Sequence, residues 1–137
     1  MSAENNKELV RKIFHEGINK QQHAAIESII DPGYINHGIP GDARGAEGFS
    51  QIVRQFTDSF PDLTITLEEV IGDGDTVATR GTWTGTHKGD FMGMPSTGKQ
   101  VKVSFMDFWK FRNGKAVENW VQMDIAGLMQ QLGAMPS

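Results

Sequence analysis

The sequence contains no cysteine. This absence excludes disulfide bonds, thiolate metal sites and a cysteine nucleophile. Histidine is scarce as well, and the four histidines, at positions 15, 23, 37 and 87, show no i, i+4 pair and no nearby carboxylate triplet. A metal site is therefore not expected. The chain also has no glycine-rich phosphate loop and no G-x-S-x-G motif, so we expect neither a nucleotide cofactor nor a triad hydrolase.

An excess of basic residues and a long apolar run are also missing. Thirteen Lys and Arg face 17 Asp and Glu, for a formal net charge of -4. Nucleic acid is therefore not expected as a partner, because phosphate binding needs a basic surface. No apolar run has the length of a membrane span, and "MSAENNKELV" does not have the pattern of a signal peptide. These features predict a cytoplasmic protein without a membrane partner.

The 137 residues are sufficient for one domain with a substantial core, and we expect a single domain over 1–137. Apolar spacing predicts helices at about 5–20, 22–30 and 46–59, the second ending at "DPG". Residues 34–45 read as irregular. Two strands follow within 63–87, joined near 72–75, and further strands follow a long loop, at 101–111 and 116–124. The order predicts an α+β fold, with three N-terminal helices packed against a strongly curved antiparallel sheet and a short C-terminal helix. Such a sheet leaves a pocket between the layers.

An acid at position 124 stands where the last strand meets the C-terminal helix. With period two, Asp124 shares a strand face with Trp120 and Gln122. A carboxylate held beside an aromatic ring and an amide, away from cations, should have a raised pKa and could act as a general base. The alternative is that Asp124 caps the helix "IAGLMQQL" by accepting backbone N–H groups. Spacing alone favours the cap.

Asp107 is the second unusual acid, because it lies alone on the apolar face of "VKVSFMDFWKF". A buried carboxylate is more often paired than catalytic, and Arg80 in the preceding strand is a candidate partner. His37 and Asn36 lie in the segment that reads as a loop, where functional residues gather, and His37 can exchange a proton near neutral pH. Each has a structural alternative, such as a hydrogen bond within its own turn.

The long loop carries several residues of ambiguous role. His87 ends the strand before it and has the same ambiguity as His37. Phe91, Met92 and Met94 follow within the loop. They either plug the end of the sheet or form the lip of an apolar pocket, since methionine adapts to irregular ligands.

Four segments together carry a family resemblance. They are "NHGIPGDARGAEG", "FPDL", "GTHKGDFMGMPSTGKQV" and "FRNGKAVENWVQMDIAGLMQQLG". In this order and at these separations they resemble the SnoaL-like polyketide cyclases, from about Tyr34 to Gly133. The resemblance implies the nuclear-transport-factor-2-like fold, in which long helices and a curved sheet enclose an apolar pocket. Ketosteroid isomerase and limonene epoxide hydrolase share that fold.

The resemblance also implies a reaction: ring closure in a polyketide ester by an intramolecular aldol step, without a cofactor. By motif position the family's acid–base aspartate corresponds to Asp124, and His37 matches a histidine in a pocket-lining segment. Asn119 departs from the pattern, because many members read Glu-His-Trp where this chain reads "ENW". Beside Asp124 and His37 as catalytic residues, the expected substrate-binding residues are Asn36, His87, Met92, Met94, Asp107, Trp120 and Gln122.

Two other functions remain open on the same scaffold. One is a non-catalytic module for small-ligand binding and dimerisation. The other is an isomerase or epoxide-hydrolase-like enzyme, for which Asp107 with Arg80 is the candidate polar network. Under each interpretation the partner is an apolar small molecule, and we expect a homo-oligomer, either a dimer or a tetramer.

Overall fold

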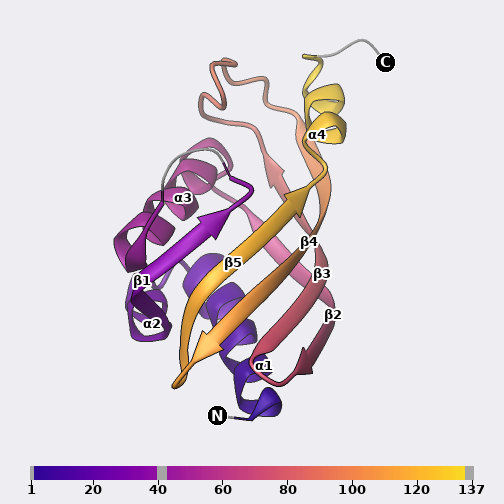
Figure 1. Cartoon of the computed structure of the whole chain (residues 1–137). Coiled ribbons are helices and arrows are strands. Elements are labelled where there is room, and N and C mark those ends of the chain that lie inside the picture. The colour runs from indigo at the N-terminus through magenta and orange to yellow at the C-terminus, as the bar shows by residue number, and fades with distance from the viewer. Residues whose placement is uncertain (1, 40–42, 135–137) are drawn as a thin grey trace.

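The computed structural model describes residues 2–39 and 43–134 (Figure 1). It confirms the α+β class, with helices first, then a sheet, then a short terminal helix. The helices are α1 (Ala3–Lys12), η1 (Ile13–Asn19), α2 (His23–Ile29), α3 (Gly45–Ser59) and α4 (Ile125–Leu132). The strands are β1 (Ile30–His37), β2 (Thr64–Asp73), β3 (Thr76–Thr86), β4 (Gln100–Arg112) and β5 (Lys115–Met123).

The first predicted helix is present but changes character halfway. The Ser2 hydroxyl caps α1 by accepting from the Asn5 backbone N–H at 3.1 Å. From Ile13 the helix continues as the π-helical η1, which the apolar spacing did not predict. Gly17 lies within η1 so close to Ile26 of α2 that an added Cβ would lie 2.7 Å from the Ile26 side chain. The glycine therefore permits the close packing of η1 on α2.

The sheet has the strand order β1-β5-β4-β3-β2 and is mixed, which corrects the expected antiparallel sheet. Residues 30–37 form β1, which pairs parallel with β5. The sequence had indicated irregular structure over residues 34–45, so the end of this strand was not predicted. Residues 40–42 of that segment lie outside the described residues. Pro32 and Gly33 are typical of a turn, so the sequence did not predict a strand at this position. At an edge strand a proline removes no essential ladder hydrogen bond, and the register shift between Ile30 and Ile35 spans both residues.

The three antiparallel pairings follow the sequence more directly. Asn113 and Gly114 both have positive φ, 51° and 76°, and join β4 to β5 in the two-residue turn that Asn-Gly favours. Along β4, buried and exposed residues alternate without interruption, as predicted. This alternation directs Asp107 inward together with the apolar residues of the strand.

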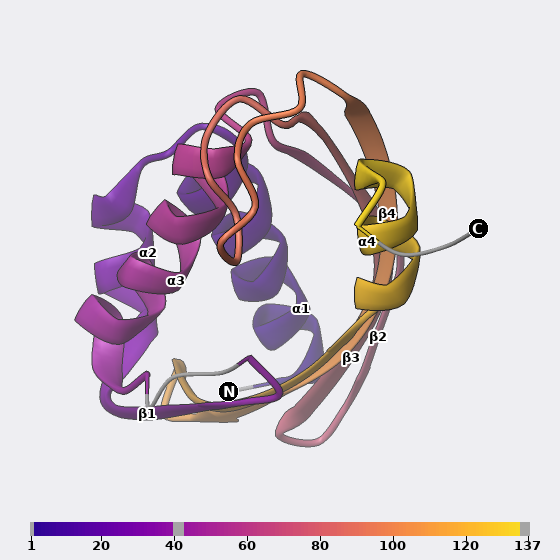
Figure 2. The same ribbon diagram turned by 90° about the horizontal axis from the view of Figure 1, so that it is seen from above.

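The helices α1, α2 and α3 lie within the curve of the sheet (Figure 2). Between these layers lies a core that includes Trp83, Trp109, Tyr34 and Phe60, all buried. At the far end of β5, α4 contacts β4, and its residue Leu128 is fully buried. Among the described residues, no helix is long and apolar enough to cross a membrane.

Candidate active site

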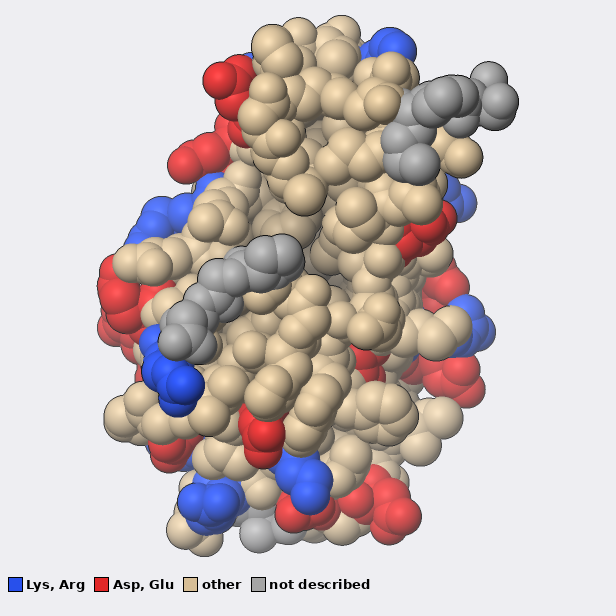
Figure 3. Space-filling model, turned by 45° about the horizontal axis from the view of Figure 1, so that its top comes forward, with Lys and Arg blue, Asp and Glu red and all other residues tan. Residues whose placement is uncertain are grey.

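An apolar cavity of about 90 Å³ lies between η1, α3 and the concave face of the sheet. Its partly exposed lining residues Ile39, Phe56, Val121 and Met123 mark the opening. Figure 3 shows this end of the molecule hollowed and its surroundings largely uncharged. The remaining lining residues are Phe14, Ile18, Asn36, Phe49, Ile52, Val53, Leu63, Ile65, Trp83, Phe105, Asp107, Trp109 and Asn119.

Asp107 is the one ionisable side chain among the described residues that line this cavity. It is 5% exposed, and the Thr79 hydroxyl, opposite it on β3, donates a hydrogen bond to its Oδ1. Burial raises the pKa of Asp107 to about 7, although the Thr79, Trp109 and Asn119 side chains favour the charged form. A carboxyl group with this pKa can accept and return a proton near neutral pH.

The expected pairing of Asp107 with Arg80 is wrong. Successive side chains of a strand point to opposite faces of the sheet, so Arg80 points outward while its neighbour Thr79 points inward. Arg80 binds Glu69 and Glu68 instead, each at 2.8 Å. The described cavity lining contains no Lys or Arg, so burial of Asp107 is not offset by a cation. The polar network suggested for an epoxide-hydrolase-like site is therefore not formed.

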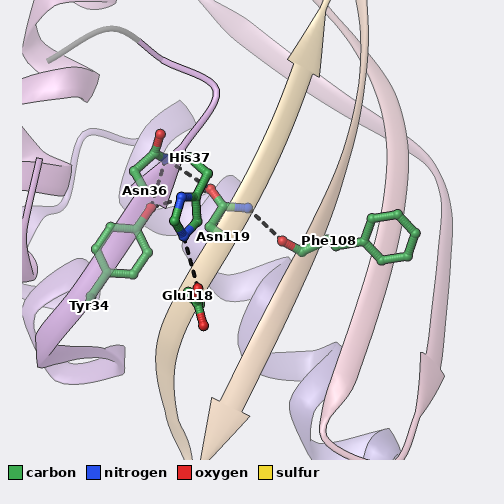
Figure 4. Close-up of polar contacts among 6 residues, drawn as sticks. All are labelled: Tyr34, Asn36, His37, Phe108, Glu118 and Asn119. Atoms are coloured by element: carbon green, nitrogen blue, oxygen red, sulfur yellow. Dashed lines mark hydrogen bonds and ion pairs between the residues drawn. The ribbon is translucent and has the colours of Figure 1, made fainter. Parts of the chain in front are cut away.

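A buried polar cluster borders Asp107. Asn119 on β5 accepts hydrogen bonds from Asn36 at 3.1 Å and Tyr34 at 3.3 Å, and donates to the Phe108 carbonyl at 2.9 Å. Figure 4 shows these contacts. Burial raises the pKa of Tyr34, and the Asp107 charge raises it further, so the Tyr34 hydroxyl stays protonated. Asn36, one of the expected substrate-binding residues, also lines the cavity.

The sequence did not single out Trp109, Asn119, Thr79 or Tyr34 as site residues. The alternation in β4 does place Trp109 on the Asp107 face, but an aromatic residue there reads as core. Asn119 stood out only as a departure from the family pattern. The strand β1, which supplies Tyr34, was not predicted.

Asp124 does not lie among the residues that line the cavity. It is exposed, and its carboxylate accepts from the Gly127 N–H at 2.9 Å as the N-cap of α4. The helix-cap alternative is thus confirmed. The strand face that Asp124 shares with Trp120 and Gln122 is the outer face of the sheet, and both of these side chains are exposed.

His37 lies on that outer face as well. Its Nε2 lies 2.9 Å from Glu118 Oε2, and its ring stacks on Trp120 with centroids 5.2 Å apart. The structure therefore brings His37 together with Trp120, and separates both from the cavity lining. His37 and Asp124 share a surface with each other and not with Asp107.

His87 and the loop after β3 form a separate cluster near the opening. His87 is fully buried against Phe60, and its Nδ1 accepts from the Thr97 N–H at 3.2 Å. Phe91 packs on Phe56, which lines the cavity, with centroids 5.5 Å apart. Met94 is partly buried against the core, whereas Met92 is 66% exposed at a φ of 50°. The loop therefore touches the cavity wall through Phe91, and none of the expected three, His87, Met92 and Met94, is part of the described lining.

The described residues offer no group of three or more His, Asp and Glu side chains that could hold a metal ion. The described lining of the cavity holds one carboxyl group of raised pKa, two asparagine side chains and two indoles within an apolar wall. This arrangement can move a proton to and from an apolar ligand.

The chain is similar to several solved structures. It matches TsrD from Streptomyces laurentii with a TM-score of 0.90 at 26% identity, covering 98% of this chain and 99% of that one. A provisionally assigned polyketide cyclase from Acidithiobacillus ferrooxidans matches with a TM-score of 0.83 at 31% identity, covering 97% and 98%. IdmH from Streptomyces antibioticus, also a provisionally assigned polyketide cyclase, matches with a TM-score of 0.80 at 30% identity, covering 92% and 96%.

No curated protein sequence matches the chain significantly. The family model described as SnoaL-like polyketide cyclase matches residues 8–132, which is most of the chain. The cone of helices and curved sheet is the nuclear-transport-factor-2-like fold of these neighbours. The family match and the structural neighbours agree: the chain belongs to the SnoaL-like polyketide cyclase family.

Proposed function

We propose that this protein is a cofactor-independent, polyketide-cyclase-type enzyme that closes a ring in an apolar, carbonyl-bearing small molecule by an intramolecular aldol step. We assign the acid–base role to Asp107 and not to Asp124. The observation that carries the proposal is a carboxyl group, with a pKa raised to about 7, as the one ionisable group among the described residues of the cavity wall.

The ionised Asp107 carboxylate would remove a proton from the carbon between two carbonyl groups of the substrate. The electron pair of the broken C–H bond becomes an enolate, and its carbon attacks a second carbonyl carbon of the same molecule. The new C–C bond leaves an alkoxide, which takes the proton back from Asp107. No oxidant or external acid is needed, and the carboxyl group ends in its starting state.

The surroundings of Asp107 suit these steps. A proton between two carbonyl groups is already acidic, so a carboxylate with a pKa near 7 is a sufficient base. The buried Trp109 indole N–H lies near enough to Asp107 to favour its charged form and makes no closer hydrogen bond to the described residues, so it can donate to an oxygen on which negative charge develops beside Asp107. Apolar residues of η1 and α3 exclude water, which strengthens such interactions.

Proton removal can be tested without the natural substrate. Purified protein is incubated in D₂O with simple β-keto esters, and deuterium entry at the central carbon is followed by NMR. We expect catalysed exchange in the wild type and a ~10²- to 10⁴-fold slower rate in Asp107→Asn, the usual value of a general base. Asp124→Asn is the matched control and should exchange normally. Equal rates for wild type and Asp107→Asn would refute the assignment.

A further inference from the structure

Two buried polar atoms of the cavity wall make no direct hydrogen bond to the described residues, and their residues lie on one row of the sheet. Asn36, Asn119 and Trp109 face one another in register across β1, β5 and β4. All three line the cavity, and all are less than 10% exposed. Among the described residues, Asn36 Oδ1 has no hydrogen-bond partner, and Trp109 Nε1 has no partner at direct hydrogen-bond distance, although its side chain favours the charged form of neighbouring Asp107. The first is an acceptor and the second a donor.

The direction of the Asn36 amide is set by its neighbours. Asn119 Nδ2 donates to the Phe108 carbonyl, which leaves Asn119 Oδ1 directed at Asn36. Asn36 Nδ2 donates to Asn119 Oδ1 at 3.1 Å and to the Tyr34 hydroxyl at 2.9 Å. Turning the Asn36 amide over would place two carbonyl oxygens against each other. Figure 4 shows the Asn36 oxygen turned away from Asn119 and Tyr34.

An acceptor fixed in this way has a chemical consequence. A buried carbonyl oxygen without a partner is costly, and a ligand that donates to it gains a hydrogen bond that water no longer supplies. A ketone, an ester or an ether has no hydrogen to donate. The Asn36 oxygen therefore selects for a ligand hydroxyl, while the Trp109 N–H suits a ligand carbonyl.

We propose that the cavity recognises a hydroxyl-bearing carbonyl compound, in which the hydroxyl donates to Asn36 Oδ1 and the carbonyl oxygen accepts from Trp109 Nε1. Asn119 is a positioning residue that holds the Asn36 oxygen available. The inference deepens the proposed function, and rests on it, by naming the substrate class of the same cavity. It concerns binding, so it is testable independently of catalysis.

The test uses two ligands that differ in one group, 4-hydroxyacetophenone and 4-methoxyacetophenone. Dissociation constants are measured by NMR titration. For the wild type we expect the hydroxyl compound to bind ~10-fold more tightly, as one hydrogen bond to a buried acceptor provides. Equal binding of the two ligands, tighter binding of the ether, or no binding of either would overturn the proposal. This wild-type comparison stands even if a variant fails to fold.

Three variants test whether Asn36 is the source of the preference for the hydroxyl ligand. In Asn36→Leu the affinity ratio should fall to about one. In Asn119→Leu the Asn36 amide loses the partner that sets its direction, so the ratio should fall to an intermediate value; a general loss of stability would weaken both ligands alike and leave the ratio unchanged. Thr82→Val, on the outer face of β3, is the control, because it touches neither the cavity nor the Asn36 amide, and its ratio should equal that of the wild type. A ratio unchanged in Asn36→Leu contradicts the hydroxyl site.

Neither probe contains a carbon flanked by two carbonyl groups, so the affinity ratio does not depend on proton abstraction. A missing hydroxyl preference combined with Asp107-dependent deuterium exchange would refute this inference alone. A hydroxyl preference without such exchange would refute the acid–base proposal alone.

Discussion

Thr79 and Asp107 face each other across β3 and β4, and the Thr79 hydroxyl donates to the Asp107 carboxylate. This donor is the leading contact that opposes the rise in the pKa of Asp107 caused by burial. The two residues therefore set together the pH at which the carboxyl group can act as a base. A neutral donor moderates the effect of burial without supplying a cation.

Replacing Thr79 with the nearly isosteric valine removes this donor. The ionised form of Asp107 then loses a hydrogen bond, so its pKa should rise above the wild-type value of about 7. We expect the midpoint of the pH profile of deuterium exchange to move up by about one pH unit, as one hydrogen bond allows. Thr82→Val, on the outer face of the same strand, is the control. A midpoint that stays in place would show that Thr79 does not tune Asp107.

Asp107→Asn should change the pH dependence of stability. The pKa of Asp107 is raised from 3.8 to about 7 on folding, so the native state holds a proton that the unfolded state has released. Stability from this group is complete below pH 4 and is lost as pH rises to 7, by on the order of 4 kcal/mol. Urea unfolding at several pH values should show this decline in the wild type and a flatter curve in the variant. Parallel curves would contradict the raised pKa.

Asp124→Ala should lower the stability of the protein without slowing deuterium exchange. The cap at the start of α4 is lost, and this should cost about 1 kcal/mol of unfolding free energy. Since Asp124 does not line the cavity, exchange measured on folded protein should match the wild type. Asp124→Asn keeps a capping oxygen and should be nearly as stable as the wild type. A folded Asp124→Asn protein with exchange reduced ~10²-fold would return the acid–base role to Asp124.

The inner face of the sheet was largely predictable. Strict alternation along residues 101–111 put Asp107 among Val103, Phe105 and Trp109, and the structure buries all four. The stripe on residues 46–59 likewise faces the core, apart from Phe56, which reaches the opening. These patterns succeed because a period of two or 3.6 residues determines which side chains share a face.

Periodicity does not say which face of a strand is the inner one when both faces carry large apolar residues. On β5 the exposed face carries Trp120, so Asp124 read as a partner of that ring in a pocket. The inner face carries Asn119, whose polar side chain reads as solvated. The match of Asn36 with Asn119 depends on the parallel pairing of β1 with β5, which "IDPGYINH" does not reveal.

The outer face of the sheet should form a contact between two copies of this chain. One row of side chains on this face crosses all five strands in register: Ile71, Ala78, Phe108, Trp120 and His37. Phe108 and Ile71 in this row are 55% and 56% exposed. Charges of both signs border this row, including Arg80, Glu69, Lys110 and Glu118, so a two-fold axis can bring unlike charges together.

We expect Phe108→Glu to convert a dimer to a monomer in light scattering and to leave the cavity intact, because Phe108 points away from it. Lys88→Glu, in the loop after β3, is the control and should remain dimeric. A wild-type protein that is monomeric at micromolar concentration would refute the contact, as would a Phe108→Glu variant that remains a dimer.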